Sequence, residues 1–118
     1  MHNLKELKIW SKAIDLTVEV YKATQNFPKE ETYGLTSQIR RCSVSIPSNI
    51  AEGAGRNSNN EFSHFLGISN GSSYELQTQL IVSNKLELLT EERLNHLLQP
   101  LDEIQKMNYA FQNTLKKI

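Results

Sequence analysis

The chain has 118 residues, of which 38% are hydrophobic and 22% charged, and its formal net charge is zero. This length fits about one domain with a core of its own. A chain of zero net charge lacks the overall positive field of a dedicated nucleic-acid-binding protein, so only a local basic patch could bind nucleic acid. No apolar run approaches the roughly 20 residues that cross a bilayer, and charges interrupt the first ten residues, unlike a secretory signal. We expect a cytoplasmic protein with no membrane partner.

The chain contains a single cysteine, Cys42, so an internal disulfide is excluded. Cys42 falls on an apolar helical stripe, where a free thiol behaves as a small hydrophobic side chain. We therefore predict that Cys42 packs in the core and has no redox or nucleophilic role.

A first amphipathic helix is predicted from Leu7 to about Gln25, because this segment lacks glycine and proline and has apolar residues at helical spacing. The residues with this spacing are Leu7, Trp10, Ile14, Val18, Tyr21 and Thr24. The helix should stop before Phe27-Pro28, since a residue that precedes proline is disfavoured in the α region.

A second helix is predicted to start near Tyr33 or Gly34. Its apolar seam recurs at steps of three and four, as in a packed bundle helix, through Leu35, Ile39, Cys42, Ile46, Ile50 and Gly53. Pro47 lies inside this helix and deletes the hydrogen bond to the Ser43 carbonyl, which favours a kink. The many small residues around Pro47 predict close helix contacts, with serine hydroxyls serving the groups that the kink frees.

Ser58 and Glu61 have the spacing of a capping box, so a third helix should begin there and run to about Leu86. Its predicted seam consists of Phe62, Leu66, Ser69, Ser73, Leu76, Leu80 and Ser83. Polar and small residues fill its middle.

Thr90, Glu91 and Glu92 mark the start of a fourth helix, since carboxylates suit a helix N-terminus. Its seam comprises Leu94, Leu97, Leu101, Ile104, Asn108, Phe111, Leu115 and Ile118, with a mild bend expected at Pro100. Asn108 is a candidate for fixing the register, as buried asparagine does in coiled coils. Four helices with short connections and no period-two alternation predict an all-α fold, an antiparallel up-down-up-down four-helix bundle forming one domain over residues 1–118.

Basic side chains are the best candidates for contacts with nucleic-acid phosphates. These are Arg40, Arg41, Arg56, Lys5, Lys8 and Lys12. The alternative is structural, because arginine equally suits bidentate pairing with a carboxylate, for which Glu52 and Glu75 are the natural partners within or between subunits. The lysines of the first helix are interspersed with Asp15 and Glu19, which is typical of a solvated face.

Small and polar residues of the second and third helices are candidates for contacts between subunits or between helices of one bundle. They are Ser45, Pro47, Asn49, Glu52, Ser72, Glu75 and Gln79. The sequence leaves both alternatives open.

Glu61 and His64 have the Glu-x-x-His spacing of ferritin-like metal sites, but the second such pair and the two further helical glutamates are missing. We find no catalytic residues, since no nucleophile has an assignable base and no phosphate-binding loop follows a strand. We expect no metal, no cofactor and no enzymatic activity.

Several blocks of the sequence form a recognisable set: Trp10, Gln38-Ile39-Arg40-Arg41, the run from Ser45 to Gly53 (SIPSNIAEG), Gly71-Ser72 and Glu75-Leu76-Gln77-Thr78-Gln79. Together they resemble the 23S rRNA intervening-sequence protein family. The resemblance covers nearly the whole chain and implies a four-helix protomer, assembly into a homopentameric ring, and genes within 23S rRNA insertions of some bacteria. A related branch, the accessory proteins of diversity-generating retroelements, binds nucleic acid through a basic barrel, whereas this chain is neutral.

These observations favour a non-enzymatic, homo-oligomeric helical-bundle scaffold that binds structured RNA or DNA through a local basic surface. The alternative is an oligomeric adaptor that binds a protein partner and has no nucleic-acid role. Steep salt dependence of nucleic-acid affinity distinguishes the two, because only phosphate contacts release condensed counterions.

Overall fold

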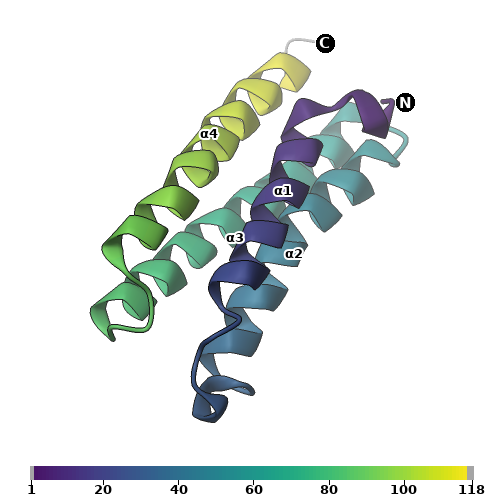
Figure 1. The fold of residues 1–118 in the computed structure, drawn as a ribbon. Coiled ribbons are helices and arrows are strands. Elements are labelled where there is room, and N and C mark those ends of the chain that lie inside the picture. Colours follow the sequence, from purple (N-terminus) through teal and green to yellow (C-terminus); the bar gives the residue numbers. More distant parts are fainter. Residues whose placement is uncertain (1, 117–118) are drawn as a thin grey trace.

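The computed structural model describes residues 2–116, in which four long helices pack side by side (Figure 1). The helices are α1 (Lys8–Ala23), α2 (Leu35–Ala54), α3 (Asn59–Lys85) and α4 (Glu91–Lys116), with short 3-10 helices at Leu4–Glu6 and Lys29–Glu31. No strand occurs within residues 2–116, which confirms the prediction of an all-helical bundle.

The contacts of α1 with α2 and with α4 show that these neighbouring helices are antiparallel. Tyr21, in the last turn of α1, and Thr24, directly after it, meet Arg40, early in α2. Lys12 of α1 likewise meets Glu103, well along α4. The start of α1 and the last turn of α4 therefore lie at the same end of the bundle (Figure 1).

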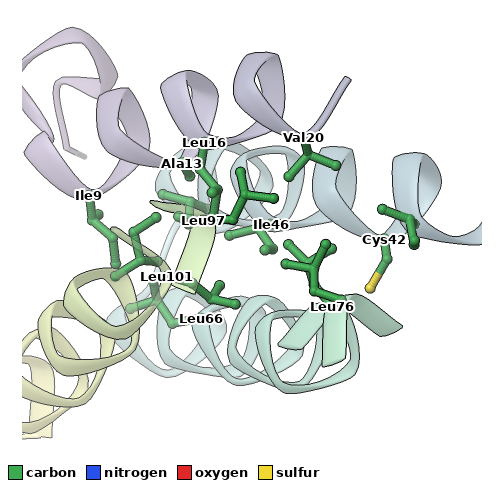
Figure 2. Packing of buried hydrophobic residues seen from close by; sticks show 14 of the residues in the cluster. Ile9, Ala13, Leu16, Val20, Cys42, Ile46, Leu66, Leu76, Leu97 and Leu101 are labelled. Atoms are coloured by element: carbon green, nitrogen blue, oxygen red, sulfur yellow. The ribbon is translucent and has the colours of Figure 1, made fainter. Parts of the chain in front are cut away.

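The predicted seams of α2, α3 and α4 form the core (Figure 2). All seven predicted seam residues of α3 are buried, including Ser69, Ser73 and Ser83. On α4 the burial extends from Leu94 to Leu115; the last predicted seam residue, Ile118, lies outside the described residues. Burial of these apolar side chains supplies the main driving force for folding.

The predicted apolar face of α1 is confirmed at Leu7, Trp10 and Thr24, which are buried or pack against the core, and is wrong in the middle of the helix. The buried face consists of Ile9, Ala13, Leu16, Val20 and Thr24. Of the predicted stripe, Val18 is 47% exposed and Tyr21 41% exposed. The helix carries two neighbouring apolar stripes, and the one with smaller side chains faces the core because it lets α1 approach the other helices closely.

Both predicted helix starts are confirmed. The Ser58 hydroxyl accepts a hydrogen bond from the Glu61 amide at 3.2 Å, and the two side chains lie 3.3 Å apart. Thr90 accepts from the Arg93 amide in the same way. These side chains satisfy amide donors that a helix start leaves free.

Pro47 is buried inside α2, and the groups around it are satisfied from neighbouring helices. The Ser43 carbonyl, which loses its usual amide donor, lies 3.0 Å from the Thr17 hydroxyl of α1. The Ile46 carbonyl accepts from the Ser69 hydroxyl of α3 at 2.9 Å. We expected serine hydroxyls of α2 to donate to the carbonyl that Pro47 frees. A threonine of α1 does so instead.

Gly53 explains how closely α2 and α3 approach. A Cβ atom at this position would lie 2.8 Å from the Phe62 ring and 2.9 Å from the Cβ of Phe65. Only a residue without a side chain fits there, as the small-residue pattern predicts. No helix within residues 2–116 is long and apolar enough to cross a membrane.

Candidate functional site

A polar groove of about 490 Å³ lies between α2 and α3 near the start of α2. We call it the α2–α3 groove; it is lined by Tyr33, Ser37, Gln38, Arg41, Cys42, Ser45, Glu75 and Gln79. One wall belongs to the Gln38–Arg41 block and the other to the Glu75–Gln79 block, so residues from two distant sequence motifs meet in one place.

In the α2–α3 groove one polar atom has no hydrogen-bond partner, and two charged side chains have no ion-pair partner, within the described residues. The Oε1 atom of Gln79 is buried and accepts no hydrogen bond. Neither Arg41 nor Glu75 takes part in the ion pairs found within residues 2–116. Unsatisfied buried acceptors are rare in folded proteins, so the Gln79 oxygen is an unusual feature of this groove.

Cys42 closes the inner side of the groove. Its thiol donates to the Ser72 carbonyl at 3.1 Å and lies 3.5 Å from Glu75. Burial, and then the nearby Glu75 carboxylate, raises the pKa of Cys42 to about 12. A thiol that stays protonated at neutral pH is a poor nucleophile, in agreement with the packing role predicted for Cys42.

A second unusual surface lies on the other side of α2. We call it the α1 ridge; it comprises Val18 and Tyr21 of α1 with Val44 of α2, which are 47%, 41% and 39% exposed. Half-buried Ile14 extends it along α1. The Thr17–Ser43 contact joins the two helices beside Val18 and Val44. This clustering on one face distinguishes the ridge from the single exposed apolar residues common on protein surfaces.

The two adjacent arginines of α2 have different environments. Arg40 donates to the Thr24 hydroxyl at 3.0 Å and to the Tyr21 carbonyl at 3.3 Å, and its guanidinium lies 4.7 Å from the centre of the Tyr21 ring. It joins α1 to α2, but its partners are a hydroxyl, a carbonyl and a ring in place of the expected carboxylate. Arg41 is exposed at the groove.

The remaining predicted phosphate-contact residues do not form one patch with these arginines. Arg56 pairs with Glu52 at 2.7 Å and lies over the Phe65 ring at 4.7 Å. Lys12 pairs with Glu103 at 2.8 Å on the α1–α4 side. Glu52 therefore pairs with Arg56, one helical turn away. It does not pair with Arg40 or Arg41.

Lys5 and Lys8 are exposed near the start of α1, at the end of the bundle that also carries Arg56. The N-terminal segment reaches α3 there, where the His2 ring packs on Phe62 with ring centres 4.8 Å apart. Both lysines are absent from the ion pairs of the described chain. Three of the six predicted residues thus lie at one end of the bundle.

The predicted contact residues divide between the core and the surface. Pro47 is buried and the Ser72 carbonyl accepts the Cys42 thiol, so both pack helices within one bundle. Asn49 donates to the Ser45 carbonyl one turn earlier at 2.8 Å. Ser45, Glu75 and Gln79 line the α2–α3 groove.

Glu61 acts in the capping box and lies 3.7 Å from Arg56, while the His64 ring packs against Phe65. Within the described part of the chain, no group of three or more His, Cys, Asp or Glu residues is placed to hold a metal ion.

Two features of these surfaces were not predicted. Tyr33 is 97% exposed at the mouth of the groove, and nothing in its local pattern distinguishes it from other loop residues. The exposure of Val18 and Tyr21 could have been anticipated from the sequence, because α1 has more apolar residues than one core-facing stripe accommodates.

Comparisons with known proteins give a family and a fold. The family model described as 23S rRNA-intervening sequence protein matches residues 5–110. A solved structure from Bacteroides thetaiotaomicron, described as a protein with unknown function from the S23 ribosomal protein family, is similar with a TM-score of 0.80. It shares 23% sequence identity, and the alignment covers 88% of this chain and 97% of the other. No curated protein matches the chain.

Proposed function

Because the chain belongs to the 23S rRNA-intervening sequence protein family, we propose that it is a non-enzymatic scaffold that assembles with copies of itself. The α1 ridge carries this proposal. Its side chains Val18, Tyr21 and Val44 are among the exposed large hydrophobics, and burying such a face against another chain is favourable by about 25 cal/mol per Å² of apolar area. A ring of five copies in the cytoplasm is the form that we propose from the family resemblance.

The chemistry of the α2–α3 groove supports a role without catalysis. Its thiol, Cys42, has a pKa of about 12, and no histidine is among its lining residues. General acid–base and nucleophilic catalysis both need groups that change protonation near neutral pH. The groove offers amides, hydroxyls and one pair of opposite charges, which are groups suited to binding.

Sedimentation of the purified protein over a concentration series tests self-assembly. We expect a species several times heavier than the 13.5 kDa chain, and we expect Val18→Glu to weaken assembly by at least about tenfold, since each 1.4 kcal/mol changes an equilibrium tenfold. The matched control is Tyr109→Glu, which places the same charge at a 63% exposed position of α4. A wild-type protein that stays monomeric at high micromolar concentration contradicts the proposal.

Binding of structured RNA is a second candidate function, and the observation that favours it is that Lys5, Lys8 and Arg56 lie at one end of the bundle, where the N-terminal segment and Arg56 both contact the start of α3. Ammonium and guanidinium groups there neutralise phosphates, and the affinity should fall steeply as salt rises. The measurement is RNA binding across a salt series for the wild type and for Lys5→Ala/Lys8→Ala.

Exposed Lys29 lies at the far end of the bundle, so Lys29→Ala is the matched control for charge removal. We expect the double variant to lose affinity and to reduce the salt slope by about two, since each phosphate contact contributes about one. Absence of binding at low salt contradicts RNA binding and leaves the scaffold as an adaptor for a protein partner.

A further inference from the structure

We propose that the guanidinium of Arg56 is a stacking surface for an unpaired base of RNA. This inference rests on the RNA binding proposed above and names the kind of RNA that this end of the bundle takes. Arg56 belongs to the short connection between α2 and α3. Figure 1 shows this connection beside the start of the chain, which carries Lys5 and Lys8.

The guanidinium of Arg56 is fixed by groups from two helices. Its Nη2 atom lies 2.7 Å from a carboxylate oxygen of Glu52 in α2, and its Nη1 atom lies 3.7 Å from one of Glu61 in α3. The ring of Phe65 in α3 lies under it, with 4.7 Å between the guanidinium carbon and the ring centre. An exposed arginine ordinarily loses rotamer freedom when it binds a ligand. Here that ordering precedes binding, which favours affinity.

These contacts occupy the edge of the Arg56 guanidinium and leave one of its flat faces open. Two carboxylates share its charge, so the phosphate contacts of this end fall mainly to the two lysines. The Arg56 side chain is still 42% exposed, and within residues 2–116 Phe65 is the one ring that lies against it. A guanidinium plane is a surface on which unpaired RNA bases stack.

Two asparagines next to Arg56 have free side-chain amides. Asn57 and Asn60 are exposed. The side-chain hydrogen bonds of this connection, within the described part of the chain, involve Arg56, Ser58 and Glu61 with Glu52. An amide offers both donors and an acceptor, which match the polar edge of a base. The asparagines that surround the capping box thereby gain a role that helix capping does not give them.

Only an unpaired base can use this surface. Inside a duplex both faces of a base are covered by its neighbours, and the deep major groove of A-form RNA excludes side chains. Lys5 and Lys8 are exposed and have no ion-pair partner within residues 2–116, so their ammonium groups are available for the phosphates on either side of the base. The bundle end therefore suits RNA with bulged or looped nucleotides better than a continuous duplex.

Three RNA duplexes test the stacking: one with a single bulged uridine, one with an abasic residue at the bulge, and one fully paired. We expect the wild-type protein to bind the bulged duplex at least about fivefold more tightly than the other two, the lower end of what one stacked base contributes. Arg56→Lys keeps the charge and loses the plane, so this preference should disappear while the salt dependence stays the same. Arg93→Lys, at an exposed position of the first turn of α4, is the matched control and should keep the preference.

The outcomes separate this inference from the RNA binding on which it rests. Failure of all three duplexes to bind at low salt overturns RNA binding and the stacking with it. Equal affinity for the bulged and abasic duplexes, or an unchanged preference in Arg56→Lys, overturns the stacking alone. An Arg56→Lys variant that also loses affinity for the abasic duplex makes Arg56 a phosphate contact and overturns the stacking as well. Thermal melting checks the fold of each variant, and the comparison of bulged with abasic duplexes needs the wild-type protein only.

Discussion

The hydroxyl of Thr17 lies 3.0 Å from the carbonyl oxygen of Ser43, the acceptor that Pro47 leaves without an amide donor. The same hydroxyl lies 2.8 Å from the Ala13 carbonyl of its own helix. Its one proton is thus available to two acceptors. A proline that would otherwise weaken α2 becomes a point at which α1 is attached to it.

We predict that Thr17→Val lowers the free energy of unfolding by about 1–3 kcal/mol, because the Ser43 carbonyl loses its donor. The corresponding fall in Tm is about 4–12 °C for a domain of this size. Thermal melts measure the change. The control is Thr78→Val, which removes only an exposed bond within α3.

A double-mutant cycle identifies the proline as the cause. Pro47→Ala supplies an amide donor to the Ser43 carbonyl, so Thr17→Val should cost less in that background. An equal cost in both backgrounds would show that the Thr17 hydroxyl stabilises the bundle independently of Pro47.

The α2–α3 contact predicts opposite effects for two glycines. Gly53→Ala should destabilise the protein by about 1–3 kcal/mol, because its new methyl group would overlap Phe62 and Phe65 in a packed core. Gly71→Ala should stabilise it by about 0.5–1 kcal/mol, because this exposed helical position has no atom within 4 Å of a new Cβ. Chemical denaturation measures both, and equal effects would mean that α2 and α3 do not pack this closely.

How far the sequence predicts the structure depends on what each residue contacts. The seams of α3 and α4 were predictable since a helix that packs on one side shows its core face as a single stripe. Helix α1 has two apolar stripes, and choosing between them requires the shapes of the opposing helices. For Arg40 the sequence leaves open a phosphate contact or a carboxylate partner, yet its neighbours across the bundle are Thr24 and Tyr21.

The surfaces were less predictable than the core for the same reason. Ser45, Glu75 and Gln79 were recognised as contact residues, but their meeting in one groove depends on the register between α2 and α3. That register is set by the close approach at Gly53 and by the Ser69–Ile46 bond. Both are contacts over more than eight residues of sequence, which local periodicity does not contain.

Cys42 should react slowly with thiol reagents. Its pKa of about 12 means that the reactive thiolate is scarce at pH 8. We expect alkylation to accelerate about tenfold per pH unit up to that pKa and to become fast at pH 8 in denaturant. Since the folded-state pKa of this thiol lies above its ordinary value of 9.0, stability should fall as pH rises from about 9 to 12. Fast alkylation of the native protein at pH 8 contradicts this environment.

Asn108 tests the buried polar contact between α3 and α4. Its Nδ2 donates to the Leu66 carbonyl at 2.9 Å, and its Oδ1 accepts from Gln112. It is only 1% exposed, so Asn108→Ala removes a buried hydrogen bond and leaves a cavity. We expect a loss of about 2–4 kcal/mol in the free energy of unfolding. Asn95→Ala on the exposed side of α4 should stay within about 0.5 kcal/mol of the wild type. Similar changes for the two variants in urea unfolding would mean that the bond to Leu66 contributes no more to stability than an exposed asparagine does.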